Sequence, residues 1–178
     1  MNTPMTLQDV RACIDDARRK RRPILLTGAN LEGLSLQGIN LRGAWLQGAC
    51  LTNANLQHAC LRGAYLQYAD LRGANLVSAD LQQANLHNAN LSEAKLQGAH
   101  VQEAQLGDAN LTHADLRGAD LRDTYLGIRG IDRVDLSLAR RSHGLIAALR
   151  DRLWSLAGIT RRRHLRPTTV LVGAEIVR

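Results

Sequence analysis

The amino-acid sequence predicts an all-β solenoid, in which short extended segments wind into stacked coils. Two observations concern a repeat of five residues. At every fifth position from Leu26 to Leu126 the residue is leucine, except for Val101, and two positions before each leucine it is alanine with three exceptions, Leu34, Ile39 and Thr124. The third observation is composition: 45% of the 178 residues are hydrophobic but only 3% are aromatic, which indicates an aliphatic core.

A period of five residues matches neither regular helix nor long strand. An amphipathic helix repeats its apolar residues every three or four positions, and a long strand alternates at every second position. An alanine and a leucine two residues apart point to the same side of a short extended segment. Each unit of five is therefore one side of a coil, with alanine and leucine inside and the other three positions facing water.

Residues 1–25 predict a capping helix followed by a basic linker. Thr6 is a suitable N-cap, Asp9 lies in the first turn, and Pro23 is expected to end the helix. The apolar residues that share one helical face are Leu7, Val10, Cys13 or Ile14, and Ala17. A solenoid exposes its last layer of core at each end, so we expect this face to cover the first coil.

Residues 26–128 form the predicted β-helix, and their repeat identifies a resemblance. Units such as LTNAN, LRGAN and LRGAD resemble the pentapeptide-repeat family, whose pattern is A(D/N)LXX, and the match covers about 100 residues without a gap. The resemblance implies a right-handed quadrilateral parallel β-helix, in which four units of the repeat make one turn. On that geometry, the units from Leu26 to Tyr125 make about five coils.

Residues 129–178 predict a decayed coil, a second helix and a basic tail. The repeat fades here, although Ile131, Val134 and Leu136 still follow the pattern. The next apolar residues at helical spacing are Leu145, Ile146, Leu149, Leu153 and Leu156. This short helix is expected either to cap the C-terminal end or to form a homodimer, and the pattern favours neither alternative.

The aromatic residues of the repeat are predicted to lie on one face. Positions four units apart stack in a column, which aligns Trp45, Tyr65 and Tyr125, while Tyr68 and His87 lie on the same side. We call these five residues the aromatic face. Exposed aromatic clusters anchor protein partners, and stacked rings also stabilise neighbouring coils. The first functional hypothesis is therefore a non-enzymatic protein-interaction module that binds through this face.

The resemblance implies a second candidate function. Relatives protect DNA gyrase from quinolone drugs with a rod that mimics DNA in size and charge. Residues 26–128 contain six basic and nine acidic residues, a net charge of −3, whereas B-DNA of the expected length of ~24 Å carries roughly 14 negative charges. Regulation or protection of gyrase or another topoisomerase is therefore the alternative hypothesis.

Basic residues gather at both ends of the predicted rod and give a third hypothesis, association with nucleic acid or an anionic membrane. The basic N-terminal cluster consists of Arg18, Arg19, Lys20, Arg21 and Arg22. The basic C-terminal cluster consists of Arg161, Arg162, Arg163 and Arg166. Solvated charge is favoured over this hypothesis, because no nucleic-acid module or aromatic stacking platform adjoins either cluster.

The sequence predicts no catalytic, cofactor or metal site and no small-molecule substrate. One column consists of Asn40, Cys60, Asp80, His100 and Asp120, and a hydrogen-bonded ladder is favoured there over metal binding. The three cysteines lack metal-type spacing. Together with the absence of a visible export signal and of a long apolar run, they lead us to expect a cytoplasmic location.

Overall fold

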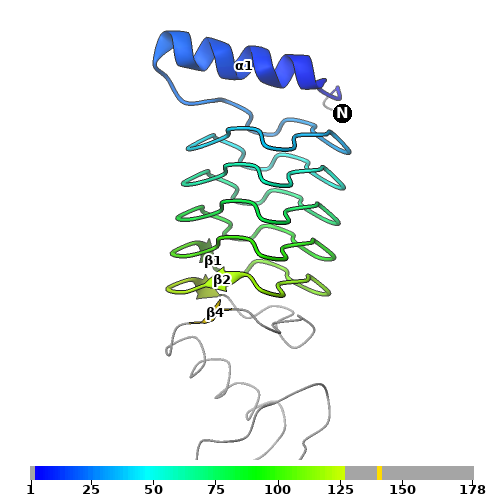
Figure 1. The fold of residues 1–178 in the computed structure, drawn as a ribbon. Helices are drawn as coiled ribbons and strands as arrows, with labels where there is room; N and C mark the ends of the chain where they lie inside the picture. The colour runs from blue at the N-terminus through cyan, green and yellow to red at the C-terminus, as the bar shows by residue number, and fades with distance from the viewer. Residues whose placement is uncertain (1–2, 127–139, 142–178) are drawn as a thin grey trace, which may run out of the picture.

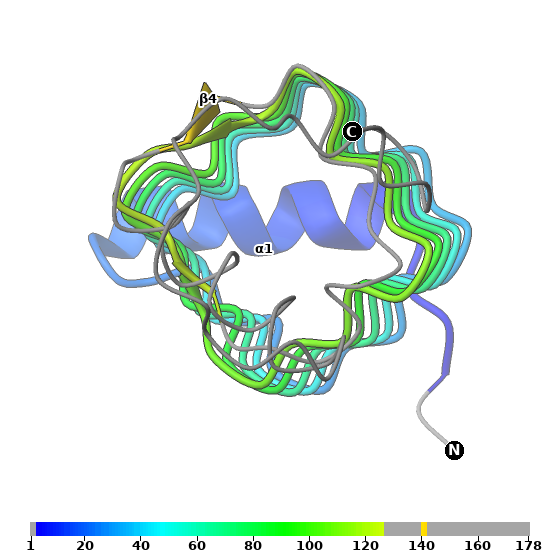
Figure 2. The same cartoon turned by 90° about the horizontal axis from the view of Figure 1, so that it is seen from below.

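The computed structural model describes residues 3–126 and 140–141, which form stacked coils with a helix across one end (Figure 1). The view along the axis shows coils of the same four-sided outline lying above one another (Figure 2). The fold is the predicted right-handed quadrilateral β-helix. The second predicted helix and the basic C-terminal cluster lie outside the described residues.

The helix α1 (Leu7–Lys20) begins as predicted at Thr6. The Thr6 hydroxyl accepts a hydrogen bond from the Asp9 N–H at 3.2 Å, and the Asp9 carboxylate accepts one from the Thr6 N–H at 2.8 Å. This reciprocal pair is a capping box. The helix ends before Pro23 is reached, because Arg21 adopts a left-handed φ of 50° and closes the last turn.

The inner face of α1 covers the first coil. Val10, Ile14 and Ala17 are buried, which confirms the predicted apolar face. Two of the departures from alanine in the repeat, Leu34 and Ile39, lie in this coil and pack partly buried against the core.

Each side of a coil ends in a turn that explains the five-residue period. In a representative unit, the Ala49 N–H donates to the Leu46 carbonyl at 3.0 Å, and Gly48 between them has a φ of 63°. A left-handed third residue is typical of a type II turn. At the position before the leucine, Asn or Asp accepts from the N–H two residues on, as Asn55 does from Gln57 at 3.2 Å.

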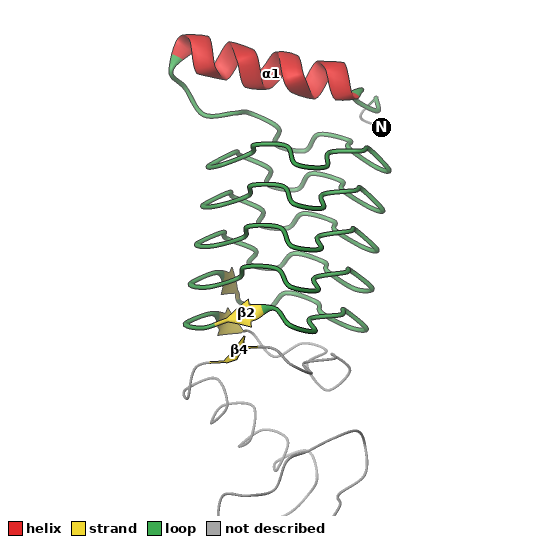
Figure 3. Ribbon diagram, in the orientation of Figure 1, coloured by secondary structure: helices red, strands yellow, loops and turns green. Residues whose placement is uncertain are grey.

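Parallel hydrogen bonds join neighbouring coils in a constant register, in which each residue pairs with its equivalent one full coil further on. The strands are short, since each side offers few extended residues (Figure 3). The two paired sets are β1 (Gln105–Leu106) with β3 (Tyr125–Leu126), and β2 (Asp120–Leu121) with β4 (Arg140–Arg141). Earlier coils are joined by isolated bridges in the same register, from Leu25 with Trp45 onward.

The leucine and alanine positions of the middle coils are almost completely buried and form one continuous aliphatic core. Thr124 replaces alanine near the end of the described rod and is also buried. Its hydroxyl donates to the Val101 carbonyl at 2.7 Å, which satisfies the polar group inside the core. Among the described residues, no helix has the length and hydrophobicity that a membrane span requires.

Candidate protein-binding surface

The structure brings the aromatic face together on one side of the rod. Backbone pairing aligns Trp45 with Tyr65 in adjacent coils, and Tyr125 follows further along the same column. The Tyr68 N–H donates to the His87 carbonyl at 3.1 Å, which fixes these two residues beside the column. The stacking of the coils therefore places all five residues where the sequence predicted them.

Trp45 and Tyr65 form an edge-to-face pair. Their ring centroids are 6.3 Å apart and the rings cross at 76°, an arrangement that the charge distribution of aromatic rings favours. The two residues nevertheless keep 42% and 43% of their surface exposed. The pair thus packs adjacent coils together and still offers aromatic surface to a partner.

Leu25 extends this column toward α1, and the sequence analysis missed it. Leu25 pairs with Trp45 and is 49% exposed. We call Leu25, Trp45 and Tyr65 the apolar strip. Leu25 lies 20 residues, or one full coil, before Trp45. It precedes the first repeated leucine, however, so the repeat alone places it in the linker.

Tyr68 occupies the left-handed corner of its turn. Its φ is 60°, and 69% of its surface is exposed. A left-handed backbone costs less for glycine than for a residue with a large side chain. Nine glycines hold equivalent corners of this rod, and the other described corners carry polar residues such as Asn53, Asn88 and Asp108. The ring projects into solvent from a strained position, which is an arrangement that packing alone does not favour.

His87 lies over Gly107, a second feature that sequence analysis missed. A Cβ atom added to Gly107 would collide with the imidazole and would lie 3.2 Å from a Tyr125 ring carbon. Asp108 stands beside the imidazole, with its carboxylate 3.9 Å from Nε2. Gly107 is therefore needed for space, so that the His87 and Tyr125 rings can approach the backbone.

The side of the rod that carries the aromatic face is almost free of charge. Among its described outward residues, between Leu25 and Tyr125, Asp108 is the one permanently charged residue. The remaining outward side chains include polar uncharged residues, namely Thr27, Gln47, Gln67, Asn85, Asn88 and Gln105. Few charges together with many aromatic residues are typical of the centre of a protein interface.

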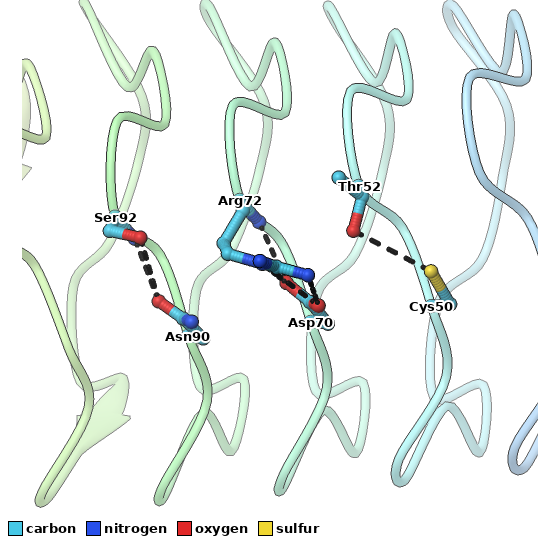
Figure 4. Close-up of polar contacts among 6 residues, drawn as sticks. All are labelled: Cys50, Thr52, Asp70, Arg72, Asn90 and Ser92. Carbon is cyan, nitrogen blue, oxygen red and sulfur yellow. Dashed lines mark hydrogen bonds and ion pairs between the residues drawn. The ribbon is translucent and has the colours of Figure 1, made fainter.

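Three arginines on other sides of the rod, Arg72, Arg117 and Arg122, pair with the aspartate two residues before them. Arg72 reaches back to Asp70 and forms hydrogen bonds of 2.7–3.0 Å with both carboxylate oxygens (Figure 4). The same figure shows Cys50 with Thr52 and Asn90 with Ser92 at equivalent positions of neighbouring coils. The hydrogen bond from Arg72 holds the pKa of Asp70 below its ordinary value.

The column that contains Asp80, His100 and Asp120 is not gathered into a metal site. Arg122 binds both Asp120 oxygens, with Nη2 at 2.7 Å from Oδ2, and this hydrogen bond lowers the pKa of the carboxyl. Among the described residues, no group of three His, Cys, Asp or Glu side chains could hold a metal ion. The turn geometry directs the Asp120 carboxylate to its own arginine instead.

Residues of the basic N-terminal cluster contact two carboxylates of α1, those of Asp15 and Asp16. The Lys20 ammonium lies 2.8 Å from Asp16, Arg19 lies 3.8 Å from the same carboxylate, and Arg22 also contacts it. The hydrogen bond from Lys20 holds the pKa of Asp16 below its ordinary value. The cluster is therefore partly neutralised, although its five cations still outnumber Asp15 and Asp16.

Comparison with known proteins defines the family. Residues 25–63, 59–98 and 89–126 match the model of the family described as pentapeptide repeats. These stretches are continuous and cover more than half of the chain, so the protein belongs to the pentapeptide repeat family. Proteins of this family are typically non-catalytic binding proteins.

Several solved structures are similar to this chain. A pentapeptide repeat protein from the thylakoid lumen of Arabidopsis thaliana is 32% identical over 53% of this chain and 70% of that chain, with a TM-score of 0.45. HetL, a protein involved in heterocyst differentiation regulation in the cyanobacterium Nostoc, is 28% identical over 65% and 67%, with a TM-score of 0.34. Rfr23 of the cyanobacterium Cyanothece is 27% identical over 75% and 95%, with a TM-score of 0.32. No curated protein matches the sequence.

Proposed function

We propose that this protein is a non-enzymatic rod that binds a partner protein through the aromatic face. One observation carries the proposal. All five residues of that face lie on one side of the rod, and among the described residues of that side only Asp108 is permanently charged. Exposed aromatic side chains supply most of the binding energy in many protein interfaces. Because this side has a single permanently charged described residue, covering its rings removes few charged groups from water.

The rigidity of the coil supports this function. Main-chain hydrogen bonds to the coils before and after hold the backbone of Tyr65 and its neighbours, as in the 2.8 Å bond from Leu46 to Tyr65. Binding costs free energy when flexible groups become ordered. A surface that is already fixed avoids most of this cost, so a narrow row of rings can bind effectively.

Site-specific photo-crosslinking tests the proposal in lysate. A photoreactive phenylalanine analogue replaces Tyr68 in the full chain, and a matched chain carries it at Val77, on the opposite side of the rod. We expect a discrete protein adduct from position 68 and none from position 77.

A second variant checks that the adduct depends on the aromatic face. Trp45→Ala and Tyr65→Ala together are expected to abolish the adduct, whereas Gln57→Ala and His58→Ala on the opposite side should preserve it. Circular dichroism and thermal unfolding must show that both variants remain folded. Equal adduct yields from positions 68 and 77 would contradict the proposal.

A further inference from the structure

The apolar strip continues past Leu25 into a shallow hollow between α1 and the first coil. Ala12, Cys13 and Ala17 line the hollow from the helix, and Pro23 and Leu25 line it from the chain that enters the coil. The lining is thus mostly apolar. Since Leu25 belongs both to the hollow and to the apolar strip, the two form one continuous surface.

The edge of this hollow is charged. Arg22 and Asp16 line it together and contact one another. Arg22 belongs to the basic N-terminal cluster, in which Arg18, Arg19 and Lys20 keep 60–75% of their side-chain surface exposed. Positive charge is therefore concentrated at the α1 end of the apolar strip. The side of the rod that carries the strip has no lysine or arginine among its described outward residues from Leu25 to Tyr125.

This combination points to the chemistry of the partner. We propose that the aromatic face binds an acidic protein segment that places an apolar side chain in the hollow and its carboxylates against the basic N-terminal cluster. This inference rests on the proposed function and adds the charge and the orientation of the partner. A partner carboxylate would share Arg22 with Asp16, and charge-assisted hydrogen bonds of this kind are the stronger ones.

Two other occupants fit the surface less well. The remaining tail of the same chain, residues 142–178, contains seven arginines and two acidic residues, so the basic cluster repels it. A nucleic-acid strand needs cations along the whole path of its backbone. On this surface the cations lie at one end, and between Leu25 and Tyr125 the one permanently charged residue that the structure describes is Asp108.

Selection from a random peptide display library tests the inference with a defined probe. The full-length protein is the target, and we expect enriched peptides to combine a large apolar residue with net negative charge. Binding of one enriched peptide, measured by fluorescence anisotropy, should weaken as salt is raised. Enrichment of neutral or basic peptides would overturn the inference.

Charge variants then locate the acidic part of the peptide. Arg19→Glu with Arg22→Glu is expected to weaken binding by roughly tenfold or more, because each acidic contact becomes repulsive. Arg19→Gln with Arg22→Gln, which adds no repulsion to α1, should weaken binding less but measurably. Arg42→Glu with Arg62→Glu, on another side of the rod, is the control and should leave the affinity within about twofold.

The outcomes separate this inference from the proposed function. If Trp45→Ala with Tyr65→Ala removes peptide binding while the charge variants do not, the aromatic face binds protein but the acidic partner is wrong. If neither set of variants changes binding, both proposals fail. Tighter binding to single-stranded DNA or to phosphatidylserine vesicles than to the selected peptide also overturns the acidic segment as the partner.

Discussion

At the scale of single residues, the outward positions of the coil carry the distinctive chemistry. The inward leucines and alanines recur from coil to coil, whereas Tyr68 places a large ring at a left-handed corner and His87 lies directly over Gly107. The backbone of Tyr68 lies in the left-handed region, and the absence of a side chain at Gly107 leaves room for the His87 ring above it. These positions are where stability and binding are expected to conflict.

Replacing Tyr68 should make that conflict measurable. Tyr68→Asn places a residue that tolerates the left-handed region at this corner, so we expect the free energy of unfolding to rise by about 1 kcal/mol. The reverse change in the next coil, Asn88→Tyr, should lower it by a similar amount. Denaturant unfolding measures both variants, and a Tyr68→Asn variant less stable than wild type would contradict the strain argument.

The His87 and Gly107 contact makes a separate prediction. Gly107→Ala should destabilise the protein by about 1 to 3 kcal/mol, because its Cβ displaces the imidazole. Once His87→Ala has removed the ring, the same change should cost much less. A double-mutant cycle from thermal unfolding tests this coupling, and additive effects would show that the two residues are independent.

At the scale of the element, the tight turn at each corner determines both the fold and its charge pattern. It lets an arginine two residues after an aspartate reach back to both carboxylate oxygens, as Arg122 does to Asp120. These pairs keep acidic residues of the rod bound to internal partners. They place arginine charge directly beside carboxylates, which is the opposite of the continuous negative surface that a DNA mimic would have to present.

The Asp120 pair should make stability depend on pH. Arg122 holds the pKa of Asp120 below its ordinary value of 3.8, so the pair stabilises the fold fully above that pH and the contribution is lost as pH falls through the lowered pKa. Asp120→Asn keeps the turn acceptor but loses the charge. We expect it to lower the melting temperature at pH 7, with the difference from wild type vanishing in strong acid.

A second variant keeps this test specific. Arg122→Gln should show the same pH-dependent loss, because it removes the other partner of the ion pair. Melting temperatures measured across the acid range by circular dichroism provide the comparison. A constant difference between wild type and Asp120→Asn at every pH would exclude the ion pair as the cause.

The sequence was sufficient for the elements whose residues repeat. The leucine and alanine positions predicted the coils, the capping residues Thr6 and Asp9 predicted α1, and the column of stacked units predicted where Trp45 and Tyr65 meet. Leu25 was missed because it precedes the first repeated leucine, and because it does not have the Asn or Asp that is common at this outward position. Gly107 was missed because it stands one position before the corner, where the repeat accepts any residue and gives no reason to expect a glycine.

At the scale of the whole molecule, the rod depends on its end cover. The first coil has a core that no coil precedes, and α1 covers it with Val10, Ile14 and Ala17 (Figure 1). At the backbone edge of this coil, the Met5 N–H donates to the Asn30 carbonyl at 2.9 Å. Uncovered edges of parallel strands pair with other chains.

The cytoplasmic location stays a prediction, as does the role of the C-terminal helix as cap or dimer contact.

Disrupting the cover should cause association. Val10→Asp buries a charge under α1 and should release the helix from the coil, since Val10 is fully buried. We expect concentration-dependent oligomers by light scattering together with retained β-helix circular dichroism. Arg11→Asp, on the exposed side of the same helix, is the matched control, and oligomers of equal size from both variants would refute the covering role.

The constant register between coils separates two ways in which this molecule can be lengthened. Duplicating a full coil moves the C-terminal part along the axis and returns every downstream residue to its own side. Inserting a single unit of the repeat, by contrast, turns everything downstream by one side, so that Tyr125 would leave the column of Trp45 and Tyr65. Length and facing direction can thus change independently within one repeat, while the leucine core continues through either insertion unbroken.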